Sequence, residues 1–169
     1  MELSRQMLLL TAENYGSYYL HITKSMKKFF LAVMALFMSF TANAFEFDGI
    51  DLNGSVADIT KQVSAKGYVF DQEKNALKGN CQGTEIFLTF NYVDVKTQGK
   101  IGQFIVDIPM KESNAFDVMT KTFNVIYHLI GKGANGGFQY SVSTDGTTLC
   151  VNKVSGGVRL TYNTPNYKK

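Results

Sequence analysis

The stretch TEIFLTFNYV, residues 84–93, decides the fold class of this chain. Ile86, Leu88 and Phe90 occupy every second position, and the residues between them are mostly polar. Successive side chains point to opposite faces of a strand, so the pattern predicts a strand with one buried face. One buried face and one solvent-exposed face are typical of antiparallel sheets, whose neighbouring strands are joined by short turns.

Further short strands are predicted on both sides of this stretch, because apolar runs alternate with turn residues containing glycine. Asp145-Gly146 and Gly156-Gly157 suit two-residue hairpin turns, which need positive φ angles. These turns would pair Val142 with Leu149, Tyr140 with Val151, and Val151 with Tyr162 on one face. The predicted strands cover residues 68–70, 76–81, 84–93, 100–108, 137–143, 147–154 and 158–163.

Two helices interrupt the strands. The first is predicted to begin at Ser55, with Asp58 completing a capping box, and to stop at Lys66-Gly67. The second is predicted to begin after Ser113 or Asn114, and its apolar residues recur at steps of three and four up to residue 130. It would end at residues 131–133.

Helices and hairpins in this order predict an α+β fold. We expect an antiparallel sheet of about seven short strands with both helices packed on its apolar face. Both predicted helices end in a Lys-Gly pair, at residues 66–67 and 132–133. The shared ending indicates two related units, each made of a helix and strands.

Residues 26–44 have the features of an export signal. Lys27 and Lys28 precede an apolar run over residues 29–40, and Ala42-Asn43-Ala44 has the small residues that a signal peptidase needs. The alternative, an uncleaved anchor, would need about 20 apolar residues, more than this run contains. We expect cleavage after Ala44, a periplasmic or secreted domain over residues 45–169, and no stable membrane anchor. On this interpretation Met26 is the true initiator, and residues 1–25 result from a start codon assigned too far upstream.

Composition limits the partners of this domain. Residues 45–169 hold 13 basic and 12 acidic side chains, a net charge of +1, and the lysines are scattered. Nucleic acid is not an expected partner, because no basic stripe is present to neutralise phosphates. One histidine and two distant cysteines do not form a metal ligand set, and no cofactor is expected.

Cys81 and Cys150 both lie in the predicted exported domain, where disulfides can persist. A bond between them would close a long loop and stabilise the fold by about 4 kcal/mol. The strand alternation instead places Cys150 on the face opposite Leu149, and Cys81 on the same face as Leu77. The two readings, bonded and free, both remain open at this point.

Three short motifs carry a resemblance to a known group. They are the F-x-G-I-x-L-x-G-S stretch of residues 47–55, Lys66-Gly67-Tyr68 and Leu77-Lys78-Gly79. The chain resembles small exported proteins of Bacteroidetes that open with the first of these motifs. At the level of fold, such domains look like the helix-on-antiparallel-sheet units of β-lactamase-inhibitor-type proteins. The resemblance implies a protein that acts by binding, and no functional residue is transferred from it.

Catalytic chemistry finds little support in the sequence. His128 is the only histidine of residues 45–169, and no motif links it to Cys81 or Cys150 as a nucleophile. Paired carboxylates for a hydrolase would have to come from scattered acids, of which Glu85 and Asp107 could face each other on neighbouring strands. The acids considered are Asp48, Asp51, Asp58, Glu85 and Asp107.

The outer face of the sheet is the remaining candidate site. The alternation gives it short amide and hydroxyl groups, two apolar side chains and one arginine. An ordinary solvated face is one interpretation, and a recognition surface is the other. For the second, Phe87 and Ile105 would be anchors and Arg159 would set orientation. The predicted face consists of Glu85, Phe87, Thr89, Asn91, Gln103, Ile105, Asp107, Gln139, Ser141, Thr148, Asn152, Arg159 and Thr161.

The sequence therefore predicts an exported, non-catalytic binding domain. Its expected partner is an exported or envelope protein, such as an enzyme that it inhibits, bound at the sheet face or at the hairpin tips. The second hypothesis is capture of a small molecule or glycan between helices and sheet, and a hydrolase comes third. Tyr68, Tyr92, Tyr140 and Tyr162 are the candidate contacts for capture, or else core residues.

Overall fold

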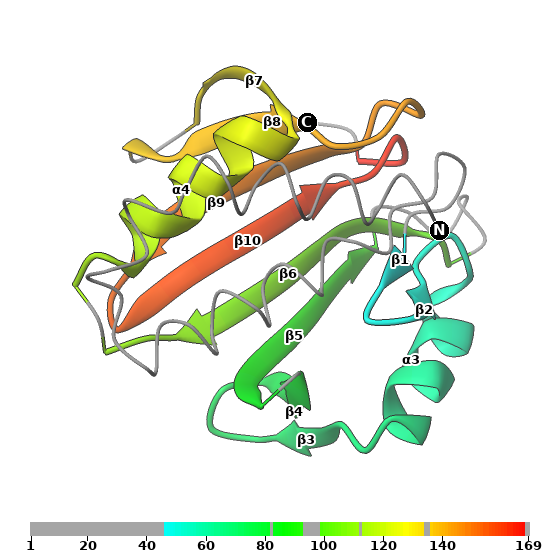
Figure 1. Cartoon of the computed structure of the whole chain (residues 1–169). Coiled ribbons are helices and arrows are strands. Elements are labelled where there is room, and N and C mark those ends of the chain that lie inside the picture. Colours follow the sequence, from blue (N-terminus) through cyan, green and yellow to red (C-terminus); the bar gives the residue numbers. More distant parts are fainter. Residues whose placement is uncertain (1–45, 82, 93–98, 112, 134–135, 168–169) are drawn as a thin grey trace, which may run out of the picture.

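The computed structural model describes residues 46–81, 83–92, 99–111, 113–133 and 136–167. In this part of the chain, eight strands form one antiparallel sheet and two helices pack on it (Figure 1). A small hairpin of β1 (Glu46–Phe47) and β2 (Ile50–Asp51) precedes the first helix. The predicted α+β class is confirmed, with one sheet strand more than expected.

The sheet consists of two groups of four consecutive strands, in the order β3-β4-β5-β6-β10-β9-β8-β7. The first unit is α3 with β3 to β6, and the second unit is α4 with β7 to β10. The last strand of each unit, β6 or β10, lies at the centre, where the two pair. The strands are β3 (Val69–Asp71), β4 (Ala76–Cys81), β5 (Thr84–Tyr92), β6 (Ile101–Pro109), β7 (His128–Lys132), β8 (Phe138–Ser141), β9 (Thr148–Val154) and β10 (Gly157–Asn163).

Local sequence sets both ends of α3 (Val56–Ala65), as predicted. The Ser55 hydroxyl accepts a hydrogen bond from the Asp58 amide at 3.2 Å and donates to the Asp58 carboxylate at 2.7 Å. At the other end Gly67 has φ +84°, and the Tyr68 amide donates to the Val63 carbonyl at 3.2 Å. This is a Schellman ending, in which glycine adopts the left-handed conformation without a steric penalty.

The second helix, α4 (Ala115–Ile126), begins where expected but ends earlier than predicted. Tyr127 is already extended, at φ −119° and ψ 154°, and His128–Lys132 forms the edge strand β7. Leu129 pairs with Tyr140 across the β7–β8 hairpin. The run from 125 to 130 is β-branched and aromatic, so its apolar spacing fits a strand as well as a helix, and pairing with β8 decides the outcome.

The two hairpin registers of the second unit differ from the prediction by two residues. Tyr140 pairs with Leu149, and Val151 pairs with Phe138 and Leu160. The Asp145 carboxylate accepts from the Thr147 amide at 2.8 Å, which makes a wider turn than Asp145-Gly146 alone would form. Because side chains alternate with a period of two, this shift keeps every residue on its predicted face.

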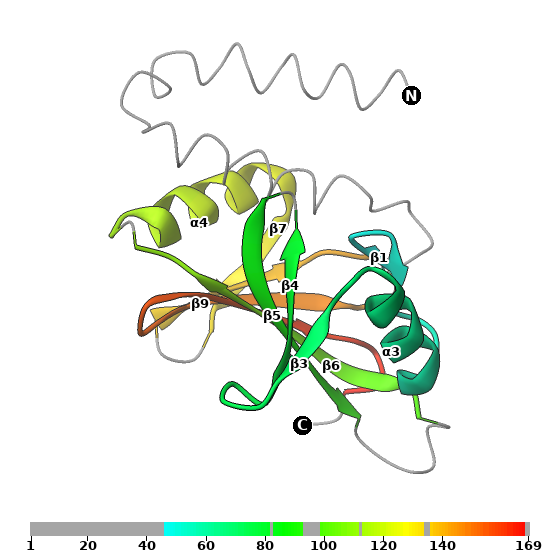
Figure 2. The same ribbon diagram turned by 90° about the horizontal axis from the view of Figure 1, so that it is seen from below.

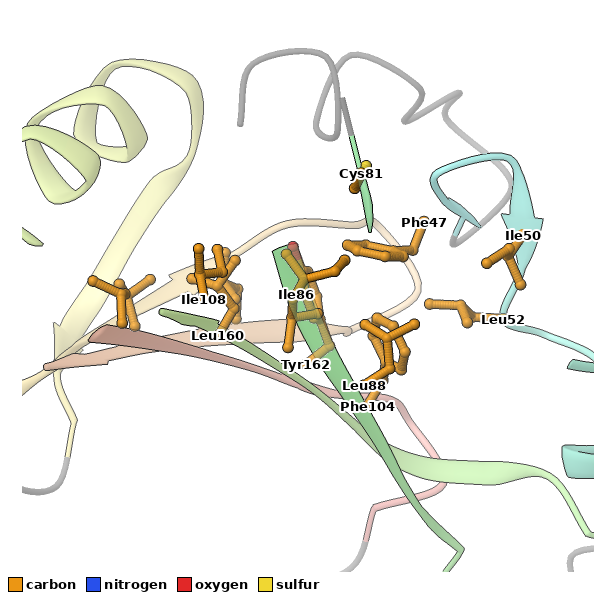
Figure 3. Close-up of a cluster of buried hydrophobic side chains, with 14 of the residues drawn as sticks. Phe47, Ile50, Leu52, Cys81, Ile86, Leu88, Phe104, Ile108, Leu160 and Tyr162 are labelled. Carbon is orange, nitrogen blue, oxygen red and sulfur yellow. The ribbon is translucent and has the colours of Figure 1, made fainter. Parts of the chain in front are cut away.

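The core lies between the sheet and the layer formed by the helices and the β1–β2 hairpin. The Phe104 ring contacts Phe47 edge-on at 4.9 Å and stacks on Phe90 at 5.3 Å between ring centroids. Figure 3 shows Phe47 and Leu52 reaching from the hairpin side toward Leu88 and Phe104 of the sheet. Seen from below, the sheet is strongly twisted and α4 lies to one side of it (Figure 2). The opposite face of the sheet is therefore left without a helix in the described chain.

Cys81 and Cys150 are not joined by a disulfide in the structure. Cys81 lies on β4 among core residues, whereas Cys150 lies on β9 and on the other face of the sheet. Four inter-strand steps separate β4 from β9, which is about 19 Å at the usual spacing. A disulfide needs α-carbons within about 7 Å.

The expected signal peptide, its cleavage site after Ala44 and the expected start at Met26 all lie outside the described residues.

Candidate functional site

The outer face is defined here as the side of the sheet that faces away from α3 and α4. On the four central strands it carries three rows of residues that lie opposite one another. The rows are Phe87, Asp107, Arg159 and Asn152; then Thr89, Ile105, Thr161 and Cys150; then Asn91, Gln103, Asn163 and Thr148. The alternation predicted from the sequence therefore assigns these side chains, apart from Asn163, to the correct face.

The third row forms a hydrogen-bonded amide ladder across β5, β6, β10 and β9. Asn91 Nδ2 donates to Gln103 Oε1 at 2.9 Å, and Gln103 Nε2 donates to Asn163 Oδ1 at 2.8 Å. Asn163 Nδ2 continues toward Thr148 Oγ1 at 3.5 Å. Each amide is held by its neighbours, so the ladder fixes side chains that would otherwise rotate freely at a wet surface.

On β4, β5, β6 and β10 the charged groups of the outer face occur as ion pairs. Arg159 donates to Asp107 through Nε at 2.6 Å and Nη2 at 2.9 Å, a two-point contact between paired strands. These hydrogen bonds raise the pKa of Arg159. Lys78 Nζ lies 2.7 Å from Glu85 Oε2, and this contact raises the pKa of Lys78. The face is thus nearly neutral.

The two apolar residues proposed as anchors differ in exposure. Phe87 is on the outer face but only 8% exposed, and Lys78 Nζ lies 5.8 Å from its ring centroid. It therefore offers a partner little surface at a position that was predicted to be an anchor. Ile105 is half-buried between Thr89 and Thr161. Arg159 keeps 46% of its side chain exposed and remains available for contact.

Sequence alternation missed Lys78 and Asn163 as members of this face. Asn163 follows Thr161 by two positions on β10, so extending the same pattern by one step would have found it. Lys78 was hidden because the residues around it on β4 include Gly79 and do not alternate clearly between polar and apolar.

His128 and the carboxylates considered for catalysis lie in separate contacts. His128 is exposed at the start of the edge strand β7, not on a helix. Glu85 and Asp107 each form an ion pair, with Lys78 and Arg159. The Asp58 carboxylate accepts from the Ser55 hydroxyl in the first turn of α3, and Asp51 accepts from the Asn53 amide at 2.9 Å. Asp48 lies at a positive φ in the β1–β2 turn, 3.6 Å from Lys66 Nζ.

The three motifs that carried the resemblance meet in space in the first unit. The Tyr68 ring packs directly on Gly79, where an added β-carbon would lie 2.1 Å from ring atom Cδ1. Burial raises the pKa of the neighbouring Cys81 thiol to about 12, and the negative charge of Asp48 adds to the shift. Burial likewise raises the pKa of Tyr68, again with Asp48 contributing. Burial of this kind favours the protonated thiol.

The aromatic residues considered for ligand capture fill the core instead. Tyr68, Tyr140 and Tyr162 are at most 4% exposed, and the side chain of Tyr92 lies outside the described residues. Tyr140 donates to Asn124 Oδ1 at 3.0 Å, which ties β8 to α4.

A shallow hollow lies at the start of α4, and its polar groups are exposed: Lys111, Ser113 and Lys153. It therefore has none of the buried, convergent polar groups that mark a built ligand site.

No group of three or more His, Cys, Asp or Glu side chains comes together in the described residues to hold a metal ion. Within the same residues, no helix has the length and apolar character needed to cross a bilayer.

Comparisons with known proteins add no relative. No protein-family model, no curated protein and no solved structure matches this chain.

Proposed function

We propose that this chain is an exported, non-catalytic domain that binds another exported or envelope protein through the outer face of its sheet. An enzyme inhibited by this contact is the kind of partner that we favour. The observation that carries the proposal is the amide ladder across four neighbouring strands, from Asn91 through Gln103 and Asn163 to Thr148.

Ordered side chains favour binding. Association normally costs about 0.5–1.5 kcal/mol for each flexible side chain that becomes fixed in the interface. Gln103 and Asn163 are already fixed by hydrogen bonds to neighbouring strands, so less of this entropy remains to be lost. A face that only solubilised the sheet would have no need of such order and more often carries free lysines and glutamates.

The distribution of charge also favours an interface. Centres of protein interfaces are depleted of free charge and often contain arginine. Here Asp107 is matched by Arg159, and the remaining groups of the three rows are uncharged: amides, hydroxyls, Phe87, Ile105 and Cys150. Arg159 retains an exposed edge, so it would contact the partner while Asp107 holds it in place.

The test is capture of a saturable partner from envelope and secreted fractions of the protein's own cell, followed by affinity measurements with surface variants. Thr161→Arg introduces a long charged side chain at the middle of the outer face, and Arg159→Ala removes the exposed cation. Each should weaken binding at least tenfold. Thr60→Arg, at an exposed position of α3, is the matched control and should bind like the unmodified protein.

Equal affinity of Thr161→Arg and Thr60→Arg would move the interface away from the outer face. The hairpin tip at Asp145-Gly146 would be the next place to mutate. A folded bait that captures no protein would contradict the proposal and favour small-molecule or glycan capture.

A further inference from the structure

Exposed apolar side chains gather at the two outer edges of the sheet. In the described chain, six large hydrophobic residues are exposed, and four of these lie on the terminal strands β3 and β7. Val69 and Phe70 on β3 are 62% and 60% exposed, and Leu129 and Ile130 on β7 are 42% and 51% exposed. Apolar groups concentrated at sheet edges favour contact with another chain.

Both edges also have unpaired backbone groups. Among the described strands, β3 pairs only with β4, and β7 pairs only with β8. Since all eight strands alternate in direction, β3 and β7 run antiparallel to each other at opposite ends of the sheet. A second copy placed beside the first, in the same orientation, would therefore present β3 to β7 in the direction that an antiparallel ladder requires.

The side chains of the two edges are complementary when each face of the sheet continues into the next copy. Leu129 lies opposite Tyr140 and Phe70 lies opposite Leu77, so both belong to the helix side. His128, opposite Ser141, belongs to the outer side. Asp71 also belongs to the outer side, because it lies two residues after Val69, which is opposite Lys78. In one register of β7 against β3, Leu129 lies opposite Phe70 and His128 lies opposite Asp71. Ile130 and Val69 then lie near each other at the same end of the paired segment.

Pairing of like edges is less favourable. Two β7 strands in antiparallel contact would bring His128 and Lys132 of one copy near the same residues of the other. Two β3 strands would set Asp71 against an apolar Val69, and both β7 edges would remain exposed. Only the unlike pairing covers all four exposed apolar residues and also matches acid with base.

We propose that copies of this chain associate edge to edge, with β7 of one copy pairing antiparallel to β3 of the next. A contact between two different surfaces does not close into a dimer, so the product is an open chain of copies. The paired segment is short, and Ile130 lies at a bulge in β7, so the association is concentration-dependent. The outer faces of successive copies would join into one continuous sheet surface.

Two variants with one blocked edge each test this arrangement. Phe70→Lys introduces a charge on β3 and Leu129→Lys introduces one on β7, both at exposed positions where folding is not expected to change. The protein is produced from the full-length chain with a C-terminal tag, and sedimentation velocity is measured from micromolar to millimolar concentration. Circular dichroism checks that each variant is folded, and Ile130→Lys replaces Leu129→Lys if the latter unfolds.

The expected result is that the unmodified protein forms species larger than a dimer as concentration rises. Each blocked variant alone stays monomeric, but an equimolar mixture forms a one-to-one heterodimer, because each variant supplies the edge that the other lacks. Tyr167→Lys removes an exposed aromatic residue that follows the central strand β10, next to Asn166, whose side chain donates to the Ile101 carbonyl of β6, and should associate like the unmodified protein. The proposal is wrong if the unmodified protein stays monomeric, if one blocked variant dimerises alone, or if the mixture does not associate.

Discussion

The two units of this protein have the same order of elements but hold their helices in different ways. In the first unit, Ser55 caps the start of α3 and Gly67 ends it, both through local hydrogen bonds. In the second unit, Asn114 makes no side-chain cap, and α4 passes directly into an extended Tyr127. The same arrangement is thus specified by local sequence in one half and by strand pairing in the other.

In both units, a backbone hydrogen bond to a glycine carbonyl anchors the segment that leads into the helix. The Val56 amide donates to the Gly99 carbonyl at 2.8 Å, and the Met110 amide donates to the Gly156 carbonyl at 2.8 Å. Gly99 and Gly156 each belong to the connection between the last two strands of their own unit. In the first unit this bond reaches the first helical residue, whereas in the second it lies five residues before Ala115. The second helix start therefore depends less on this bond.

The largest expected effect tests whether the two units unfold together. Phe104 is fully buried on the central strand β6, and its ring also contacts Tyr162 of the second unit at 6.0 Å between centroids. Phe104→Ala should lower the free energy of unfolding by about 3–5 kcal/mol in one cooperative transition, measured by urea denaturation. Phe70→Ala, at an exposed edge position, should change it by less than about 0.5 kcal/mol. Two separate transitions would mean that the units are independent.

A second pair of substitutions compares a glycine in each unit. Gly79→Ala would drive a β-carbon into the Tyr68 ring and should destabilise the fold by about 1–3 kcal/mol, measured in urea. Gly131→Ala, on β7, is the matched control because no atom lies within 4 Å of its added β-carbon. Combining Gly79→Ala with Tyr68→Ala should cost less than the sum of the two single changes. Additive costs would show that the ring is not the obstacle.

Alkaline pH should lower the stability of the fold through Cys81 and not through Cys150. The pKa of Cys81 is raised to about 12 by burial and by Asp48, while an unfolded cysteine has a pKa near 8.5. The contribution of the protonated Cys81 thiol to the free energy of unfolding is fully present below the unfolded pKa. It is lost as the pH rises from that value toward 12. Between pH 8 and 10 the unmodified protein should lose about 2 kcal/mol more than Cys81→Ala does, by urea denaturation. Cys150→Ala should show the same pH dependence as the unmodified protein.

The smallest effects concern the helix starts. Ser55→Ala removes the cap of α3 and should cost about 1 kcal/mol of unfolding free energy. Asn114→Ala removes a side chain that makes no capping bond and should change it by a few tenths of a kcal/mol. Thermal unfolding of the two variants beside the unmodified protein measures the difference. Equal losses would contradict the contrast between the units.

The sequence predicted the parts of the fold that depend on local signals. The start and end of α3 and the strands around residues 84–93 follow from capping residues and period-two alternation, and the structure agrees with them. The end of α4 could not be predicted, because residues 125–130 suit a helix and a strand equally and only contact with β8 distinguishes them. The β8–β9 register was missed because the bonds of Asp145 widen its turn, and the β9–β10 register was missed because the two-residue turn is Ser155-Gly156, one position earlier than predicted.

The members of the outer face were predictable, but their interactions were not. Alternation assigns Asn91 and Gln103 to one face, yet only the strand order shows that Asn163 completes the ladder beside them. Burial of Phe87 depends on Lys78 of a neighbouring strand, which no pattern within residues 84–93 reveals.

The amide ladder also has a direction. Every step donates from an NH2 group toward the second unit, from Asn91 to Gln103, then to Asn163 and on to Thr148. The bond dipoles consequently add, with an amide oxygen at the β5 end and a hydroxyl at the β9 end. Although the two units have the same order of elements, the two ends of the ladder therefore differ in polarity. A molecule that binds the outer face can distinguish one orientation from the same orientation rotated by 180°.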